Sequence, residues 1–267
     1  MLQGFAHATA VTPIDVDPGV SGRFAATVHD GWDIGGNANG GYLMAIAVRA
    51  MSDTIGRPPL TVTGHYLRPA PAGECEIEVS TIRSGRRLAT ASATLTMVGK
   101  PTLTLLATFG DQTPGGPVMA MDDPVELPSY DECSMPDATD GPKPELMNRI
   151  AVRMHPDDSG FRSGEPSGRP EMRGWFDLAD SEPIDAIGLM LAADAFPPPV
   201  FNSGLPVAWA PTVELTVHVR GVPAPGPLRC AFRSRFIHDG LLDEEGEIWD
   251  STGALVCQSR QLALTPR

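Results

Sequence analysis

The two halves of this chain share one pattern, and that repetition constrains the fold more than any other feature of the sequence. A helix candidate at residues 40–54 is followed by four runs of alternating apolar and polar residues, broken at "PAPAG", "SGRR" and "VGKP". A second helix candidate at residues 183–196 is again followed by strand-like runs, broken at "VPAPG", "HDG" and "STG". Period-2 alternation indicates strands, and breaks rich in Gly and Pro indicate turns. We therefore predict a duplicated unit of one long helix and an antiparallel meander.

Matching positions in the two halves keep a nearly constant separation. His65 and His218, and likewise Gly99 and Gly253, lie about 153–154 residues apart. One unit alone could not cover its helix, whereas two units side by side form a long sheet around two helices. The sequence thus predicts an α+β fold in which two helix-plus-antiparallel-sheet units make a pseudo-dimer within one chain.

A change in composition marks the boundary between the halves. Residues 111–140 carry eight Asp or Glu and five Pro but no Lys or Arg, which is typical of a surface segment rather than of a core element. We predict an N-terminal unit at 1–110, an acidic, proline-rich linker or insert at 111–169, and a C-terminal unit at 170–267. Residues 111–140 are expected on the outside of the molecule.

Composition restricts the partners and the compartment. The net charge of −13 argues against nucleic acid, which attracts clustered Lys and Arg. No apolar run is long enough for a membrane span, and the N-terminus lacks a signal-peptide pattern, so we expect a cytoplasmic protein. No cysteine pair or cysteine–histidine group has zinc-like spacing, so we predict no metal site and four reduced thiols, at Cys75, Cys133, Cys230 and Cys257.

Segments from both halves carry a resemblance to a known family. They are "GNANGGYLMAIAVRA", "HYLRPAPAGE" and "STIRSGRRLATASATL" in the first half, and "LMLAADAFPPP", "APTVELTVHVRG" and "STGALVCQSRQLAL" in the second. In combination they resemble the double hot-dog acyl-CoA thioesterases of the acyl-CoA thioesterase II type, over nearly the whole chain except the acidic segment. The resemblance implies a double hot-dog fold and hydrolysis of acyl-CoA to free acid and coenzyme A. Coenzyme A would then enter as part of the substrate, with no other cofactor.

Asp194 is the best candidate for a general base. Its helical neighbours at i−3, i−4 and i−7 are apolar, and an acid on an apolar stripe is costly unless it is used or paired. Burial and a position near the end of a helix should both raise its pKa. The alternative is a surface Asp just before the "PPP" break, and the competing base is Asp53, whose i−4 neighbour Arg49 suggests an exposed pair. In the resembling family the catalytic Asp lies on the second helix, at the position of Asp194.

The resemblance adds a Thr and a Gln that hold the attacking water, here Thr212 and Gln261. Alternation places Gln261 on a mostly apolar or small face of the last strand. Regular alternation turns Thr212 away from the apolar face, so it must lie at an irregular strand start to face Asp194. Both could also be ordinary strand residues. The first copy has Ala107 where the second has Gln261, so we predict one working site rather than two.

Two further groups are candidates for substrate binding. Gly40 and Gly41 open the first helix, where free backbone N–H groups could polarise a thioester carbonyl. Alternatively, the glycines only let the helix pass close under the sheet. Arg86 and Arg87, together with Arg83, form a local basic cluster that could contact the phosphates of coenzyme A or simply be a solvated hairpin.

The remaining alternatives concern activity and assembly. The chain lacks a Gly-x-Ser-x-Gly elbow, a phosphate-binding glycine loop and a His-Glu-x-x-His motif. A hydro-lyase of the same fold would need a His at the helix mouth, which neither "GNANGG" nor "SEPIDA" supplies. The leading prediction is an acyl-CoA thioesterase, and the alternative is a non-catalytic acyl-CoA-binding protein. Sheet edges and outer faces leave room for a homo-oligomer, whose copy number the sequence does not set.

Overall fold

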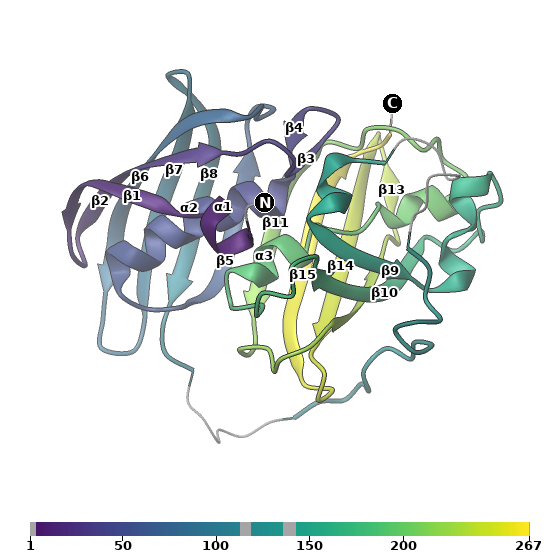
Figure 1. The fold of residues 1–267 in the computed structure, drawn as a ribbon. Helices are drawn as coiled ribbons and strands as arrows, with labels where there is room; N and C mark the ends of the chain where they lie inside the picture. Colours follow the sequence, from purple (N-terminus) through teal and green to yellow (C-terminus); the bar gives the residue numbers. More distant parts are fainter. Residues whose placement is uncertain (1–3, 113–118, 136–142, 267) are drawn as a thin grey trace.

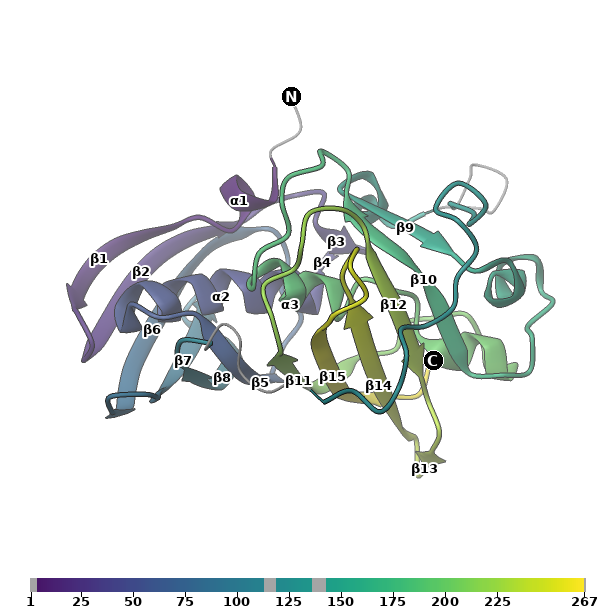
Figure 2. The same ribbon diagram turned by 90° about the horizontal axis from the view of Figure 1, so that it is seen from below.

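The structure is a computed structural model that describes residues 4–112, 119–135 and 143–266. One antiparallel sheet of 13 strands runs through both halves of the described chain, and a two-stranded hairpin lies beside it. The sheet curves around a long central helix, α2, which Figure 1 and Figure 2 show in the hollow of the N-terminal half. This arrangement confirms an α+β fold built on antiparallel pairing.

The N-terminal half contains the predicted helix followed by the four predicted strands. Two further strands precede the helix, and the spatial order of this half of the sheet is β1-β2-β6-β7-β8-β5. The elements are α1 (Phe5–Ala8), β1 (Val11–Asp17), β2 (Ser21–Val28), β3 (Asp33–Ile34), β4 (Asn37–Ala38), α2 (Gly40–Ile55), β5 (Pro59–Tyr66), β6 (Gly73–Ser84), β7 (Ala89–Met97) and β8 (Lys100–Phe109).

The C-terminal half continues the sheet in the order β11-β15-β14-β12-β10-β9. Its elements are the 3-10 helix η2 (Glu145–Asn148), β9 (Ile150–Met154), η3 (Pro156–Asp158), η4 (Gly160–Ser163), β10 (Glu171–Leu178), α3 (Gly188–Ala192), η5 (Pro199–Ser203), β11 (Thr212–Val219), β12 (Leu228–Arg233), β13 (Ile237–His238), β14 (Leu241–Trp249) and β15 (Leu255–Leu264). The short strand β13 pairs with β14 outside the main order.

The two halves meet where β5 pairs with β11. These strands run antiparallel with Thr63 opposite Thr216, and their side-chain oxygens lie 2.9 Å apart. Because this pairing continues the backbone ladder, the sheet has no break between the halves. The strand order on one side of the β5–β11 junction mirrors the order on the other side.

The interpretation of residues 111–169 as a linker or insert is wrong for residues 150–154. They form β9, which pairs with β10 at the edge of the sheet, and their alternate side chains are buried. The strand is only five residues long, so the acidic and proline-rich sequence around it concealed its alternation. Within the acidic segment, residues 113–118 and 136–140 lie outside the described residues. The described part from 119 to 135 is mostly exposed.

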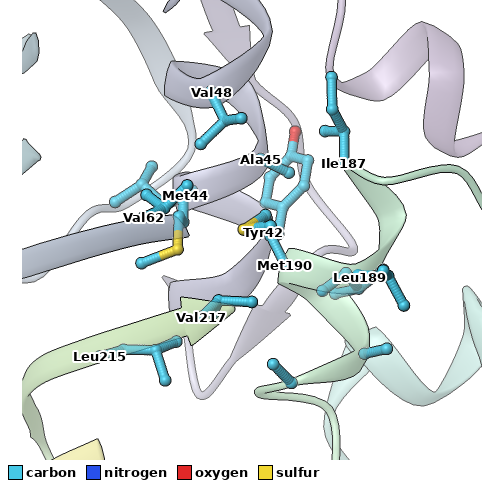
Figure 3. Packing of buried hydrophobic residues seen from close by; sticks show 14 of the residues in the cluster. Tyr42, Met44, Ala45, Val48, Val62, Ile187, Leu189, Met190, Leu215 and Val217 are labelled. Atoms are coloured by element: carbon cyan, nitrogen blue, oxygen red, sulfur yellow. The ribbon is translucent and has the colours of Figure 1, made fainter. Parts of the chain in front are cut away.

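The core lies between α2 and the concave face of the sheet. Eleven of the sixteen residues of α2 are buried, and Met44 and Val48 pack against the sheet where Val62 and Val217 project from β5 and β11 (Figure 3). α3 packs against α2 close to the middle of the molecule. No helix among the described residues is long and apolar enough to cross a membrane. All four cysteines are buried and free of disulfides.

The predicted helix at 183–196 is wrong in extent, because α3 covers only Gly188–Ala192. The carboxylate of Asp185 accepts hydrogen bonds from the backbone N–H groups of Ile187 and Gly188, so the chain turns there before the helix begins. Proline has no N–H to donate and cannot extend a helix, so the prolines from residue 197 onward prevent a longer one. Asp194 therefore lies just beyond α3 rather than within it.

Candidate active site

A cleft of about 330 Å³ opens at the N-terminal end of α2. α2, β5, β11, β14, β15 and the segment after α3 all contribute to its walls. Its polar side chains are Asn39, Tyr66, Arg68, Asp194, Thr212, Glu244 and Gln261, together with Asn37 at one side. Apolar walls include Ile34, Leu43, Phe196, Trp209 and Leu264. The cleft thus joins a small polar floor to an apolar lining, as small-molecule sites commonly do.

The glycine-rich entry to α2 forms two separate turns. Gly35 and Gly36 have φ angles of 63° and 83° and connect β3 to β4, a conformation that glycine adopts without strain. Asn39 then caps α2, since its Oδ1 accepts a hydrogen bond from Tyr42 N at 2.9 Å. The ring of Tyr42 stacks on buried Trp32 with centroids 5.1 Å apart. The hairpin and the cap together fix the first turn of α2 at the cleft.

Asp194 is held against that first turn. Its Oδ2 accepts hydrogen bonds from Gly41 N and from Asn39 Nδ2, both at 2.9 Å. Asn39 Nδ2 also donates to the backbone oxygen of Asp194 at 2.7 Å. All of these donors engage Oδ2 or the main chain, so Oδ1 makes no protein hydrogen bond among the described residues. The carboxylate is thus anchored by one oxygen and offers the other to the cleft.

The environment of Asp194 adjusts its basicity. Burial raises the pKa of Asp194 from its ordinary value of 3.8 to about 6, while the backbone amides of Gly41 and Gly40 and the amide of Asn39 act in the opposite direction. The pKa of neighbouring Tyr66 rises well above its ordinary value, because burial and the nearby Asp194 charge both oppose its ionisation. A carboxylate with a pKa near 6 is ionised at neutral pH and basic enough to accept a proton from water.

The amide of Gly41 is not free, although a role in polarising a thioester carbonyl would require a free amide. Gly41 N–H is already used by Asp194, and a Cβ at Gly41 would lie 2.3 Å from the backbone oxygen of Met190. A Cβ at Gly40 would meet Asp194 Oδ2 and the Tyr66 ring, each at 3.0 Å. The absence of side chains at both positions lets α2 lie directly against α3 and against Asp194. The close approach at Gly41 is to α3, whereas the sequence alternative was passage of the helix close under the sheet.

Thr212 and Gln261 lie in the same cleft as Asp194. Gln261 is 7% exposed, and its Nε2 donates to Thr212 Oγ1 at 2.9 Å. The β11–β15 register shifts between Thr212 and Glu214, so the strand begins with the irregularity that an inward-facing Thr212 requires. The structure thus brings together the three residues that the sequence predicts as a catalytic set.

The predicted basic cluster does not lie at this cleft. Arg86 and Arg87 are exposed in the turn between β6 and β7, where Arg57 donates to Gly85 O. That turn lies at the C-terminal end of α2, about 24 Å from its N-terminus at 1.5 Å per residue. Arg68 is the basic side chain that lines the cleft among the described residues. Asp53 is also distant, since it is exposed near the C-terminal end of α2.

Besides Arg68, sequence reasoning missed three residues of the site, Asn39, Tyr66 and Glu244. Asn39 carries an available signal, because Asn directly before a helix is a preferred cap. Glu244 carries a second one, because alternation in "LLDEEGEIW" places it on the same face as Leu242 and Ile248. No such signal marks Tyr66, whose hydroxyl donates to Gly40 O at 2.8 Å. Within the described ranges, no group of three His, Cys, Asp or Glu side chains could hold a metal ion.

Two family models match the chain. Residues 28–110 match the family model described as the acyl-CoA thioesterase N-terminal domain, and residues 124–265 match the model of the acyl-CoA thioesterase C-terminal domain. The second match begins before residue 170 and so includes β9. An uncharacterized protein of Mycobacterium tuberculosis is 28% identical, with 98% of each chain covered.

Two solved structures are similar over the full length of the chain. A candidate thioesterase II from Thermobifida fusca is 32% identical, with a TM-score of 0.88 and all of both chains covered. A protein of unknown function with a hot-dog fold, from Alicyclobacillus acidocaldarius, is 22% identical, with a TM-score of 0.84, covering 100% of this chain and 99% of the other. The large antiparallel sheet around α2 is therefore a hot-dog architecture.

Proposed function

The chain belongs to the acyl-CoA thioesterase family, and from that premise we propose that it hydrolyses acyl-CoA to a free acid and coenzyme A with water activated by Asp194. One observation carries the proposal. The Asp194 carboxylate is fixed through Oδ2, leaves Oδ1 facing the cleft, and shares that cleft with the Thr212–Gln261 pair. General-base hydrolysis needs this combination of a fixed base and polar groups that hold water.

The proposed reaction has two steps. The water oxygen bonds to the thioester carbonyl carbon while Asp194 Oδ1 accepts a proton from that water, and the carbonyl oxygen takes the negative charge. The carbon–sulfur bond then breaks as the carbonyl re-forms, and the proton held by Asp194 passes to the departing coenzyme A sulfur. The base is thereby restored for the next turnover.

We assign stabilisation of the tetrahedral intermediate to a side chain rather than to the Gly41 amide. Gly41 N–H is engaged by Asp194, so it does not serve the carbonyl oxygen. Gln261 Nε2 has two hydrogens, of which one is donated to Thr212, and the other is the donor that we assign to the developing oxyanion. Thr212, in turn, can donate its hydroxyl proton to the attacking water.

The same cleft suggests where each part of the substrate lies. Leu43, Phe196 and Leu264 offer apolar surface for the acyl chain. Arg68 is exposed at the cleft and is suited to phosphate oxygens of coenzyme A, a role that we propose for it in place of Arg86 and Arg87.

The finer architecture is also a proposal: two hot-dog units related by a pseudo-twofold axis through the β5–β11 junction. The mirrored strand orders and the Thr63–Thr216 pair, whose members are 153 residues apart, support it. Pro59 begins β5, and Thr212 begins the corresponding strand β11. Ala107 is paired with Val62 of β5, and Gln261 occupies the corresponding position opposite Leu215 of β11. The first unit thus has Pro59 and Ala107 where the second has Thr212 and Gln261, which supports a single active site.

Thiol release from short-, medium- and long-chain acyl-CoAs tests the function directly. The expected result is release by the purified protein and its near-complete loss in Asp194→Asn, which also excludes a contaminating hydrolase. Saturable binding of acyl-CoA without thiol release would contradict hydrolysis and support the non-catalytic alternative. Absence of both binding and release would contradict acyl-CoA as the ligand.

A further inference from the structure

Glu244 is a buried carboxyl group that the proposed mechanism does not use. It is 8% exposed and lines the same cleft as Asp194. It lies on β14 directly opposite Gln261 of β15. Side chains of residues directly opposite each other in an antiparallel pair project from the same face, with Cβ atoms about 4.5–5.5 Å apart. The Glu244 carboxyl and the Gln261 amide are therefore neighbours on the floor of the cleft.

Gln261 has one amide atom without a partner. Its Nε2 donates to Thr212, but its buried Oε1 receives no hydrogen bond from any described residue. A buried acceptor without a donor costs about 1–3 kcal/mol. An ionised carboxylate at Glu244 could only accept hydrogen bonds, whereas the neutral acid carries one hydroxyl donor.

The charges around Glu244 favour the neutral acid. The acidic groups that act on it are Asp194, from the segment after α3, and Asp243, from its own strand. Across the cleft lie the Tyr66 phenol of β5 and the Arg68 guanidinium, and neither forms a hydrogen bond or ion pair with Glu244. Burial, followed by the charges of Asp194 and Asp243, raises the pKa of Glu244 well above its ordinary value. Two neighbouring carboxyl groups buried in one cleft do not ionise together readily, so one stays protonated while the other acts as base.

We propose that Glu244 is a positioning residue: as a neutral carboxylic acid it donates its proton to Gln261 Oε1 and so fixes the direction of the Gln261 amide. The resulting chain runs from the Glu244 hydroxyl to Gln261 Oε1, and from Gln261 Nε2 to Thr212 Oγ1. The Thr212 hydroxyl proton then remains available for the attacking water. Ionised Glu244 would instead attract Nε2, turn the amide over, and make Thr212 a donor to Oε1. The protonation state of Glu244 thereby sets which way the hydrogen bonds point in the site.

The first test needs no catalysis, although the assigned role itself rests on the proposed function. The side-chain carboxyl carbon of Glu244 is followed by NMR in protein labelled with 13C-glutamate, and its signal is identified by its loss in Glu244→Gln. We expect the chemical shift of a neutral acid at pH 7. We also expect Glu244 ionisation at higher pH to shift the Gln261 side-chain amide signals. A Glu244 carboxyl that titrates like an exposed glutamate, or amide signals that ignore its titration, would overturn the proposal.

The second test uses the kinetics of thioester hydrolysis. Glu244→Gln supplies an amide donor in place of the hydroxyl and should keep kcat within about threefold, while Glu244→Ala removes the donor and should lower kcat by roughly 10- to 100-fold with little change in KM. Glu247→Gln, which alters the opposite face of the same strand, is the matched control and should be neutral.

Thermal melting of each variant separates misfolding from misorientation. If Glu244→Gln is as slow as Glu244→Ala while both remain folded, the donor role is refuted. If the wild-type protein releases no thiol from any acyl-CoA, the proposed function fails, and the NMR titration alone then decides the protonation state and contact of Glu244.

Discussion

Asp194→Asn is the substitution that separates the chemistry of the site from its geometry. Both donors to the carboxylate, Gly41 N and Asn39 Nδ2, engage Oδ2. An asparagine that places its Oδ1 at this position keeps both hydrogen bonds and replaces only the atom facing the cleft with a neutral NH₂. The variant therefore loses the base without losing its anchors.

The expected kinetic loss follows from removal of general-base catalysis. We expect kcat/KM for thioester hydrolysis to fall by roughly 10²–10⁴-fold, or about 2.7–5.5 kcal/mol in the activation free energy. Since the pKa of Asp194 is about 6, wild-type kcat/KM should rise as pH increases through about 6 and then level off. The residual activity of Asp194→Asn should lack this step.

The same substitution should make the protein more stable at high pH. The pKa of Asp194 is raised from 3.8 to about 6, so the folded state holds this proton more tightly than the unfolded chain. Below pH 3.8 both states are protonated, and ionisation has no effect on stability. Between 3.8 and 6 the wild type loses stability as pH rises, and above 6 the cost reaches an upper limit of about 3 kcal/mol.

Melting curves at pH 4 and pH 8 measure this difference. Asp194→Asn should melt several degrees above the wild type at pH 8 and close to it at pH 4, since about 1 kcal/mol shifts Tm by about 2–4 °C in a chain of this size. Asp53→Asn, at the exposed end of α2, is the control and should change activity little. Full activity in Asp194→Asn, with its loss in Asp53→Asn, would refute the assignment of the base.

Three further predictions test the rest of the site. The losses of kcat/KM in Gln261→Ala and Asp194→Asn should not add in the double variant, because groups that hold one water act as a unit. Measuring kcat/KM for both single variants and the double variant tests this, and fully additive losses would show that the two residues act independently. Gly41→Ala should lower the free energy of unfolding by roughly 1–3 kcal/mol through overpacking against α3, and an unchanged denaturation midpoint would show that α3 moves aside freely. Arg68→Ala should raise KM for acyl-CoA severalfold with kcat nearly unchanged, whereas Arg86→Ala should do neither; the reverse pattern would return the phosphate contact to the basic hairpin.

Local sequence signals were sufficient for much of the fold. Alternation identified the four strands that follow α2 and the four longer strands that follow α3, and the apolar run with its glycine entry identified α2. Such signals fail where an element is short or unusually composed. β9 has only five residues and lies within a proline-rich region. The predicted length of α3 was too great, because periodicity does not reveal that the hydrogen bond from Gly188 N to the Asp185 side chain delays the start of the helix.

Some features of the site likewise follow from local sequence patterns, whereas others depend on the tertiary structure. The sequence alone determined that Gln261 points inward, because the strand period acts over a few residues, and it singled out Asp194 as an acid among apolar neighbours although Asp194 lies beyond α3. Only the tertiary structure decided that Gly41 N–H meets Asp194, 153 residues further along the chain, and so is not free for the substrate. It likewise decided that Glu244 faces Gln261 and that Arg86 lies at the far end of α2. These facts depend on strand register and on the packing of α3 against α2, which bring together groups that no local pattern connects.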